Sequence, residues 1–124
     1  MPAPRADRGA AAEALACRFL EQQGLRCIDR NVHCRFGEID LVMQAADLLV
    51  FVEVRYRRSA NPVSAVESVD FRKQKKLSLA AAWYLARTPR VQNCSVRFDV
   101  IAIDGRSQAQ SALQWIQDAF RPGA

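Results

Sequence analysis

Four charged side chains lie within two short apolar runs of the sequence: Glu38 and Asp40 in the first, Glu53 and Arg55 in the second. Both runs are rich in β-branched residues, and the break between them at 44–47 is typical of a hairpin loop. Because side chains alternate along a strand, the two charges of each run share one face. Burying a charged side chain is costly unless it is paired or bound to a metal. This pattern favours a divalent cation held between the acids.

The register of the predicted hairpin decides whether these charges meet. Pairing Met43 with Leu48 puts all four on one face, with Glu38 opposite Glu53. The alternative is an edge hairpin whose outer face is exposed to water, with the same charges as ordinary solvated positions. The two alternatives predict the same strands, so the choice depends on the rest of the chain.

Length and composition indicate one globular domain. The chain has 124 residues, half of them hydrophobic, and a net charge of +5, which suits a single sizeable core. No apolar run approaches the ~20 residues of a membrane span. The four cysteines lack Cys-x-x-Cys spacing and His33 is the only histidine, a pattern that argues against a structural zinc site and favours buried free thiols in a reducing cytoplasm.

The positive charge is concentrated in one segment. Residues 55–90 contain nine Lys or Arg but only the acids Glu67 and Asp70. A basic segment beside an acidic patch suits a polyanion whose phosphates meet a metal. The alternative is a solvated helix face that is basic for solubility. We expect nucleic acid as the partner, in particular DNA, and no membrane; a homodimer is one option for the oligomeric state.

The predicted fold class is α/β, a single domain in the order α-β-β-β-α-β with a mixed sheet flanked by helices, plus a short C-terminal helix. Residues 1–6 are expected to form a flexible tail and 7–124 the domain. Capping signals and periodicity predict a helix from Asp7 to Gln23 ending at Gly24, strands over 25–35, 37–43 and 48–58, a loop over 59–67, a helix from the N-cap Ser68 to about Arg87, a strand over 95–103, and a closing helix over 113–120.

Two further charged residues sit at the edges of apolar helix stripes. Glu13 borders the stripe of the first helix, where an ordinary surface glutamate is the simpler interpretation. Lys73 lies one turn before Leu77, in register with the apolar side of the second long helix. Its simpler interpretation is a lysine that snorkels over apolar surface; the alternative is that it brings an ammonium group to the acidic patch.

The element order, with an acid on the second strand and Glu-x-basic on the third, resembles the PD-(D/E)xK nuclease superfamily. This superfamily has the restriction-endonuclease-like fold that is shared with Holliday-junction resolvases. A closer resemblance is to the YraN family of bacterial proteins. It covers nearly the whole chain and rests on Gly9, Glu13, Arg30-Asn31, Gly37-Glu38-Ile39-Asp40-Leu41, Phe51-Val52-Glu53-Val54-Arg55, Lys73, Arg97-Phe98-Asp99-Val100 and Asp118-Ala119-Phe120.

The resemblance implies a role for each matching residue. Asp40 and Glu53 look like the metal-binding acids, with the backbone carbonyl of Val54 as a third ligand. Glu13 looks like the first-helix acid that some resolvase-like members direct toward the metal. The implied chemistry is hydrolysis of a phosphodiester bond by a metal-activated water. Mg²⁺ or Mn²⁺ is the implied cofactor, since such a site offers oxygen ligands and leaves room for water.

Arg55 departs from the superfamily pattern, which has lysine there. Arginine stays protonated at any relevant pH, so Arg55 could orient water or neutralise charge but could not act as a base. Two functions remain open: a metal-dependent nuclease, with Lys73 supplying the missing ammonium, or a binding module with little catalysis. In both, the expected nucleic-acid-binding residues are Arg57, Arg58, Arg72 and Lys75.

Overall fold

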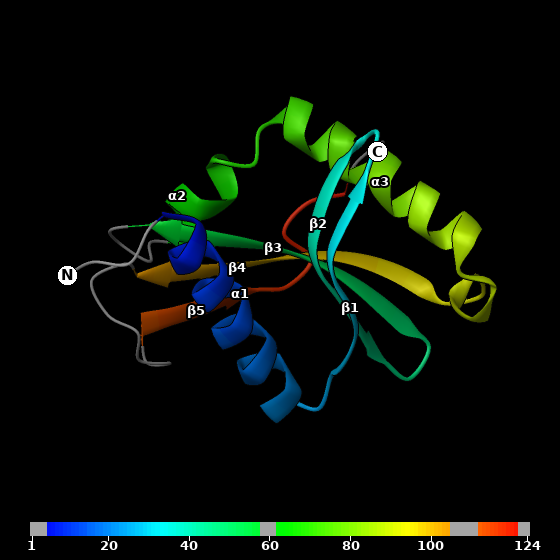
Figure 1. The fold of residues 1–124 in the computed structure, drawn as a ribbon, viewed down its shortest axis with the longest axis horizontal. Coiled ribbons are helices and arrows are strands. Elements are labelled where there is room, and N and C mark those ends of the chain that lie inside the picture. The colour runs from blue at the N-terminus through cyan, green and yellow to red at the C-terminus, as the bar shows by residue number, and fades with distance from the viewer. Residues whose placement is uncertain (1–4, 58–61, 105–111, 122–124) are drawn as a thin grey trace.

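The computed structural model describes residues 5–57, 62–104 and 112–121 (Figure 1). The elements follow the order α-β-β-β-α-α-β-β, with one 3₁₀ turn. They are α1 (Arg5–Gln22), β1 (Arg26–Cys34), β2 (Gly37–Ala45), β3 (Leu48–Arg57), α2 (Pro62–Glu67), α3 (Phe71–Arg87), η1 (Pro89–Val91), β4 (Ser95–Asp104) and β5 (Leu113–Ile116).

The strands form one mixed sheet in the order β1-β2-β3-β4-β5. All neighbours are antiparallel except β3 and β4, which are parallel from Leu48–Ser95 to Arg57–Asp104. A parallel pair needs a crossover connection, and here the segment with α2 and α3 provides it. The architecture is therefore a single α/β domain consistent with the restriction-endonuclease-like core that was predicted.

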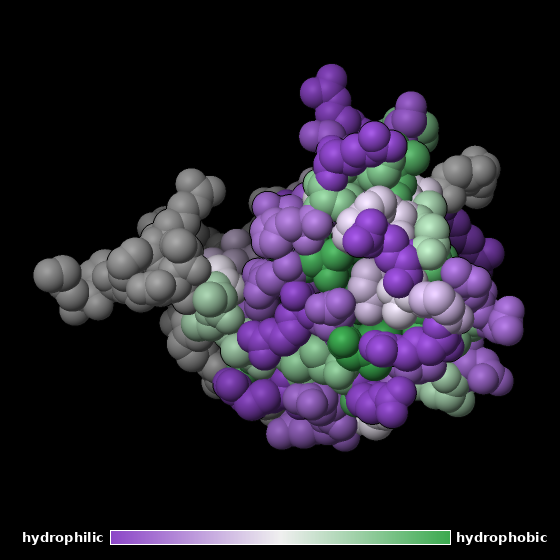
Figure 2. Space-filling model, turned by 45° about the vertical axis from the view of Figure 1, so that its right-hand side comes forward, coloured by the Kyte–Doolittle hydropathy of each residue, from purple (hydrophilic) through white to green (hydrophobic). Residues whose placement is uncertain are grey.

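The central strand β3 is buried on both faces, which explains its uninterrupted apolar run. Val50 and Val52 face α1, while Leu49 and Phe51 face α3. Helix α2 and the first half of α3 cover β4 through a third cluster that includes Ala65, Val69, Leu77, Val100 and Phe120. The face drawn in Figure 2 shows hydrophobic residues as separate islands among hydrophilic ones. No helix in the described ranges is long and apolar enough to cross a membrane.

Helix α1 ends as predicted but begins earlier. At its C-terminus Gly24 adopts φ 95° and the Leu25 N–H bonds to the Leu20 carbonyl at 3.1 Å, a Schellman-type ending that needs the conformational freedom of glycine. The helix already includes Arg5, so the prediction that Asp7 caps its N-terminus is wrong, and so is the predicted tail at positions 5 and 6. Residues 1–4 lie outside the described ranges.

The predicted loop 59–67 and helix N-cap Ser68 are also corrected. Residues Pro62–Glu67 form α2, and the long helix is capped by Asp70, whose Oδ1 accepts from the Lys73 N–H at 2.8 Å. The Ser68 hydroxyl instead donates to the Ala65 carbonyl at 2.6 Å and belongs to the end of α2. Serine and aspartate are both good caps, and the intervening short helix decides between them.

The predicted C-terminal helix is a strand, β5, which pairs antiparallel with β4. Leu113 and Trp115 point to the α1 side of the sheet, while Ile116 contacts the α2 side. The spacing of Leu113, Ile116 and Phe120 therefore imitates a helical stripe, although the chain alternates like a strand.

A fully buried carboxylate, Asp99, fastens this C-terminal segment. It accepts two bonds of 2.8 Å from the Arg97 guanidinium, one of 2.9 Å from the Trp115 indole and one of 3.0 Å from the Asp118 N–H. The Ala119 N–H donates to the Phe98 carbonyl at 2.8 Å. A buried charge is tolerated when hydrogen bonds satisfy it, so Asp99 joins β4, β5 and the residues after β5.

Candidate metal and nucleic-acid site

The site begins where β2 separates from β3. Pairing of these strands runs from Ala45–Leu48 to Leu41–Val52 and ends there. The register expected from sequence, Met43 with Leu48, is wrong by two residues because the turn is only Ala46-Asp47, with Ala46 at φ 52°. Continuing the observed register by one step brings Asp40 level with Glu53.

Because β2 has separated from β3, a backbone N–H of β3 donates its hydrogen bond to a side chain of β2. Asp40 Oδ2 accepts from the Val54 N–H at 2.8 Å. In an antiparallel pair the N–H and C=O of one residue point to the same neighbouring strand. The Val54 carbonyl therefore also faces the edge that β2 has left, on the side of Asp40.

Glu53 is the buried acid of the site, with 7% of its side chain exposed. Its Oε1 lies 3.4 Å from Arg55 Nη2 and 3.7 Å from Lys73 Nζ. Burial first, and then the Asp40 carboxylate, raise the pKa of Glu53 from 4.5 to about 7, against the lowering effects of Lys73 and Arg55. An acid held this far from its ordinary pKa is typical of functional sites.

Asp40 is perturbed in the same direction. Burial raises the pKa of its carboxyl, although the Val54 N–H and the Lys73 cation act against that rise. Two neighbouring carboxyls that both resist ionisation form a site in which an added cation would relieve the cost of burying charge.

Lys73 reaches the acids from the first turn of α3. The Asp70 cap fixes that turn by bonding the Lys73 backbone, and the side chain, 36% exposed, extends to Glu53. It therefore does not lie over apolar surface with its ammonium in bulk water. Arg55 is more buried, and its Nε has no hydrogen-bond partner among the described residues.

Glu13 of α1 lies beside Asp40 and also interacts with Arg30 and Asn31 of β1. Burial and the Asp40 carboxylate raise its pKa, while Arg30 and a hydrogen bond from Asn31 lower it. Asn31 has φ 51° within β1, a conformation that asparagine tolerates better than most residues. Glu13 Oε1 is buried without a partner in the described part of the chain, so this residue is not the surface glutamate that its spacing favours.

Glu38 is an exposed acid whose charge helps to raise the pKa of both Asp40 and Glu13. It pairs with His33, at 3.2 Å between Oε1 and Nδ1, and 64% of its side chain is exposed. The expectation that it faces Glu53 fails with the predicted register. Across the described ranges, no three His, Cys, Asp or Glu side chains form a potential metal-binding group. Among the described residues, the candidate metal ligands are the Asp40 and Glu53 carboxylates and the Val54 carbonyl, which do not form a closed cage.

The remaining sequence-predicted residues are less informative. Arg72 and Lys75 are exposed on α3. Arg57 is the last residue of β3, and Arg58 lies outside the described residues. All four cysteines are free, as expected, but only Cys17 is buried; there burial raises the thiol pKa to about 12.

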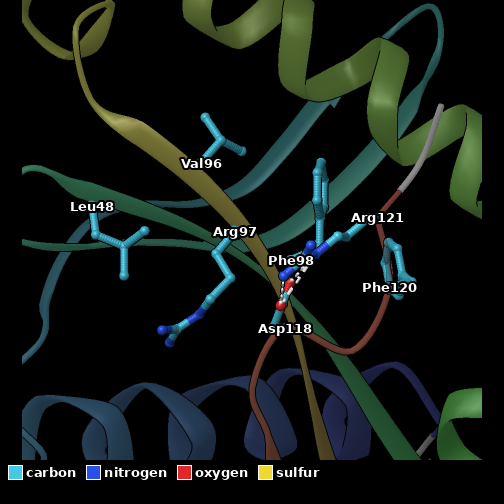
Figure 3. Close-up of a pocket in the computed structure, with 7 residues that line it drawn as sticks. All are labelled: Leu48, Val96, Arg97, Phe98, Asp118, Phe120 and Arg121. Carbon is cyan, nitrogen blue, oxygen red and sulfur yellow. Dashed lines mark hydrogen bonds and ion pairs between the residues drawn. The ribbon is translucent and has the colours of Figure 1, made fainter. Parts of the chain in front are cut away.

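One groove lies away from Asp40 and Glu53. It has a volume of about 410 Å³ and is lined by residues of β3, β4 and the C-terminal segment (Figure 3). Its charged residues are paired: Arg97 with the buried Asp99, and Arg121 with Asp118 at 2.7 Å. The chemistry described above is instead at the open end of the β2–β3 pair.

Comparison with known proteins gives the family. The model of "Uncharacterised protein family UPF0102" matches residues 12–103, which contain Glu13, Asp40, Glu53 and Lys73. The chain belongs to the UPF0102 family. A UPF0102 protein of Xanthomonas campestris is 51% identical over 121 residues, covering 98% of this chain and 97% of its own. UPF0102 proteins of Pseudomonas syringae and Nitrosococcus oceani are 51% and 48% identical, over 94% and 97% of this chain and 94% and 96% of theirs.

Proposed function

We propose that this UPF0102 member is a metal-dependent nuclease that hydrolyses phosphodiester bonds, with DNA as its substrate. The observation that supports this most is the buried Glu53, which is beside Asp40 and is reached by two cations from different elements. A carboxylate that serves only structure would be expected to have its hydrogen bonds satisfied, as Asp99 has. Glu53 has Arg55 and Lys73 as partners, yet burial and Asp40 raise its pKa to about 7, an electrostatically unfavourable state that a metal ion would relieve.

The residues present fit Mg²⁺ or Mn²⁺. The ligands would be Asp40, Glu53 and the Val54 carbonyl, all oxygen donors. Mg²⁺ is usually held by one or two carboxylates and keeps several waters, so an incomplete protein shell suits it. The ion would supply an activated water and neutralise charge on the phosphate.

The chain's own residues would divide the other tasks. Arg55 is fixed as a cation and would neutralise charge developing on the phosphate, as donors aimed at the transition state do. Lysine can lose a proton where arginine cannot, so in its neutral amine form Lys73 would be the group that accepts the proton of the attacking water. Glu13 lies close enough to Asp40 for the two carboxylates to repel each other, so Glu13 would oppose the ionisation of Asp40 until a cation binds.

Arg72, Lys75 and the basic residues at the end of β3 would hold the flanking phosphates. Contacts of this kind set affinity and position rather than sequence preference. They would make binding strongly dependent on salt.

A second function is favoured by Arg55 in place of lysine: a nucleic-acid-binding module that keeps the fold but has little turnover. It has the same basic surface, so binding alone does not separate the two. The carboxylates separate them, because acids facing phosphate oppose binding in the absence of a metal.

The deciding experiment is cleavage of labelled linear, flapped and four-way DNAs in Mg²⁺ or Mn²⁺, with Asp40→Ala as the inactive control. Metal-dependent cleavage that Asp40→Ala abolishes supports the nuclease. Salt-dependent binding without cleavage favours the module. Neither cleavage nor binding of any of these DNAs would refute both.

A further inference from the structure

The turn between β1 and β2 contains an arginine that the candidate site has not used. Arg35 is exposed, and its guanidinium lies 4.8 Å from the centroid of the Phe36 ring. The Phe36 ring is half-buried against the cluster that contains Ala80 and Tyr84 of α3. The arginine is therefore supported by a fixed aromatic surface, which is a favourable cation–π arrangement.

The same turn packs directly on α3. A Cβ placed on Gly37 would lie 3.7 Å from the Cβ of Lys76. In Figure 1 the β1–β2 hairpin arches across α3 at this end. The turn and the first half of α3 thus form adjoining surfaces, although about forty residues of sequence separate them.

Both surfaces lie close to Asp40 and Glu53. Gly37 precedes Asp40 by three strand residues, about 10 Å at ~3.3 Å each. Lys76 follows Lys73 by three helical residues, about 4.5 Å at 1.5 Å each. Since Lys73 contacts Glu53, the turn lies about 10 Å from the site. Measured along the axis of a DNA duplex, where each strand carries one phosphate per ~3.4 Å, that distance corresponds to about three phosphates.

The charge of this surface suits phosphate. Arg35 and Lys76 are both exposed, and the neighbouring acid Glu38 is engaged by His33. A guanidinium held over a ring presents a planar fork that matches phosphate oxygens, with less side-chain entropy to lose than a free arginine.

We propose that Arg35 is a phosphate-binding residue for a nucleic-acid strand that enters the site along the β1–β2 turn and α3. The inference rests on the proposed function and adds the direction from which the strand approaches. It also distinguishes Arg35 from the exposed arginines of β1, Arg26 and Arg30.

The test compares Arg35→Ala with Arg26→Ala. Both remove one exposed arginine from β1 or its end, but Arg26 lies at the opposite end and bonds Gln44 at 2.9 Å. Fluorescence anisotropy with labelled single-stranded and duplex DNA would be recorded over a salt series. We expect Arg35→Ala to weaken binding about 10-fold and to reduce the salt slope by about 1, as the loss of one phosphate contact predicts. Arg26→Ala should change binding less than 2-fold.

A third variant, Arg35→Lys, keeps the charge but not the planar fork, and should recover the salt slope with only part of the affinity. Equal effects of Arg35→Ala and Arg26→Ala, at unchanged melting temperature, would overturn the inference and leave the proposed function standing. Absence of DNA binding by the wild type would overturn both. Normal DNA binding without cleavage would leave the role of Arg35 intact and overturn only the proposed nuclease activity.

Discussion

Neutralising Glu53 should stabilise the metal-free protein, although it removes the residue most central to the site. The folded protein holds this carboxyl at a pKa of about 7 instead of 4.5. Between these values the folded state binds more protons than the unfolded state, so the free energy of unfolding falls as pH rises through this window. Stability from this group is complete below about pH 4.5 and is lost above about pH 7.

The pKa difference sets an upper bound on the effect. At about 1.36 kcal/mol for each pKa unit, ionising Glu53 costs the folded state up to ~3 kcal/mol at pH 8. Glu53→Gln avoids that cost but removes the partner of Lys73 and Arg55, which regain water only partly at 36% and 23% exposure. We expect a net gain of about 2 kcal/mol at pH 8, or roughly 8 °C in melting temperature for a chain of this size, and little difference at pH 5.

Urea unfolding followed by circular dichroism at pH 5, 6, 7 and 8 in EDTA would measure this. Glu67→Gln, which removes an exposed carboxylate on α2, is the matched control and should change stability by less than ~0.5 kcal/mol. Adding Mg²⁺ at pH 8 should stabilise the wild type by mass action and Glu53→Gln much less. A variant that is no more stable than the wild type at pH 8, or whose gain is independent of pH, would refute the reasoning.

The other predictions concern turnover, binding and the buried carboxylate. If the DNA panel is cleaved, Lys73→Ala should lower turnover at least ~10-fold, the low end for an acid–base group, whereas Arg55→Lys should keep or raise it; normal rates for Lys73→Ala would exclude that lysine. Neutralising Arg72 and Lys75 together should weaken DNA binding and flatten its salt dependence, and an unchanged slope in the anisotropy titration would make them solubilising residues. Asp99→Ala should destabilise by about 3–5 kcal/mol, because it leaves the partly buried Arg97 without its partner; a chemical-denaturation loss under 1 kcal/mol would contradict this.

Local patterns in the sequence predict the central part of the fold well. The apolar run of β3 identifies a strand because both of its faces are buried. Gly24 identifies the end of α1 because a left-handed residue is required there. These features depend on neighbours close in the chain, so they can be read without the tertiary structure.

The register between β2 and β3 could not be predicted from the alternation of side chains. Alternation has a period of two, so it fixes which face Asp40 occupies but does not distinguish a register from one shifted by two residues. The length of the turn decides, and it depends on Ala46 accepting a positive φ. The face was therefore predicted, while the opposite neighbour was not.

The parts that were missed depend on distant contacts. Glu13 interacts with Asn31 and Arg30 of β1, and helix periodicity does not detect such contacts between distant parts of the chain. The strand β5 exists because β4 provides an edge for it, and over four residues its alternation is too short to outweigh a helix-like spacing. The contribution of Arg35 likewise requires knowing that the β1–β2 turn reaches α3.

The Asp99 linkage also has a consequence for how the molecule opens. Its four donors come from β4, β5 and the backbone after β5. Releasing the C-terminal segment would therefore leave a carboxylate in the apolar layer with only Arg97 to compensate its charge. Partial detachment is therefore costly, and the edge strand and its inner neighbour should open as one cooperative unit, with amide hydrogen exchange in both at a common rate. A segment of four paired residues, which would fray readily on its own, should therefore open only together with the inner strand.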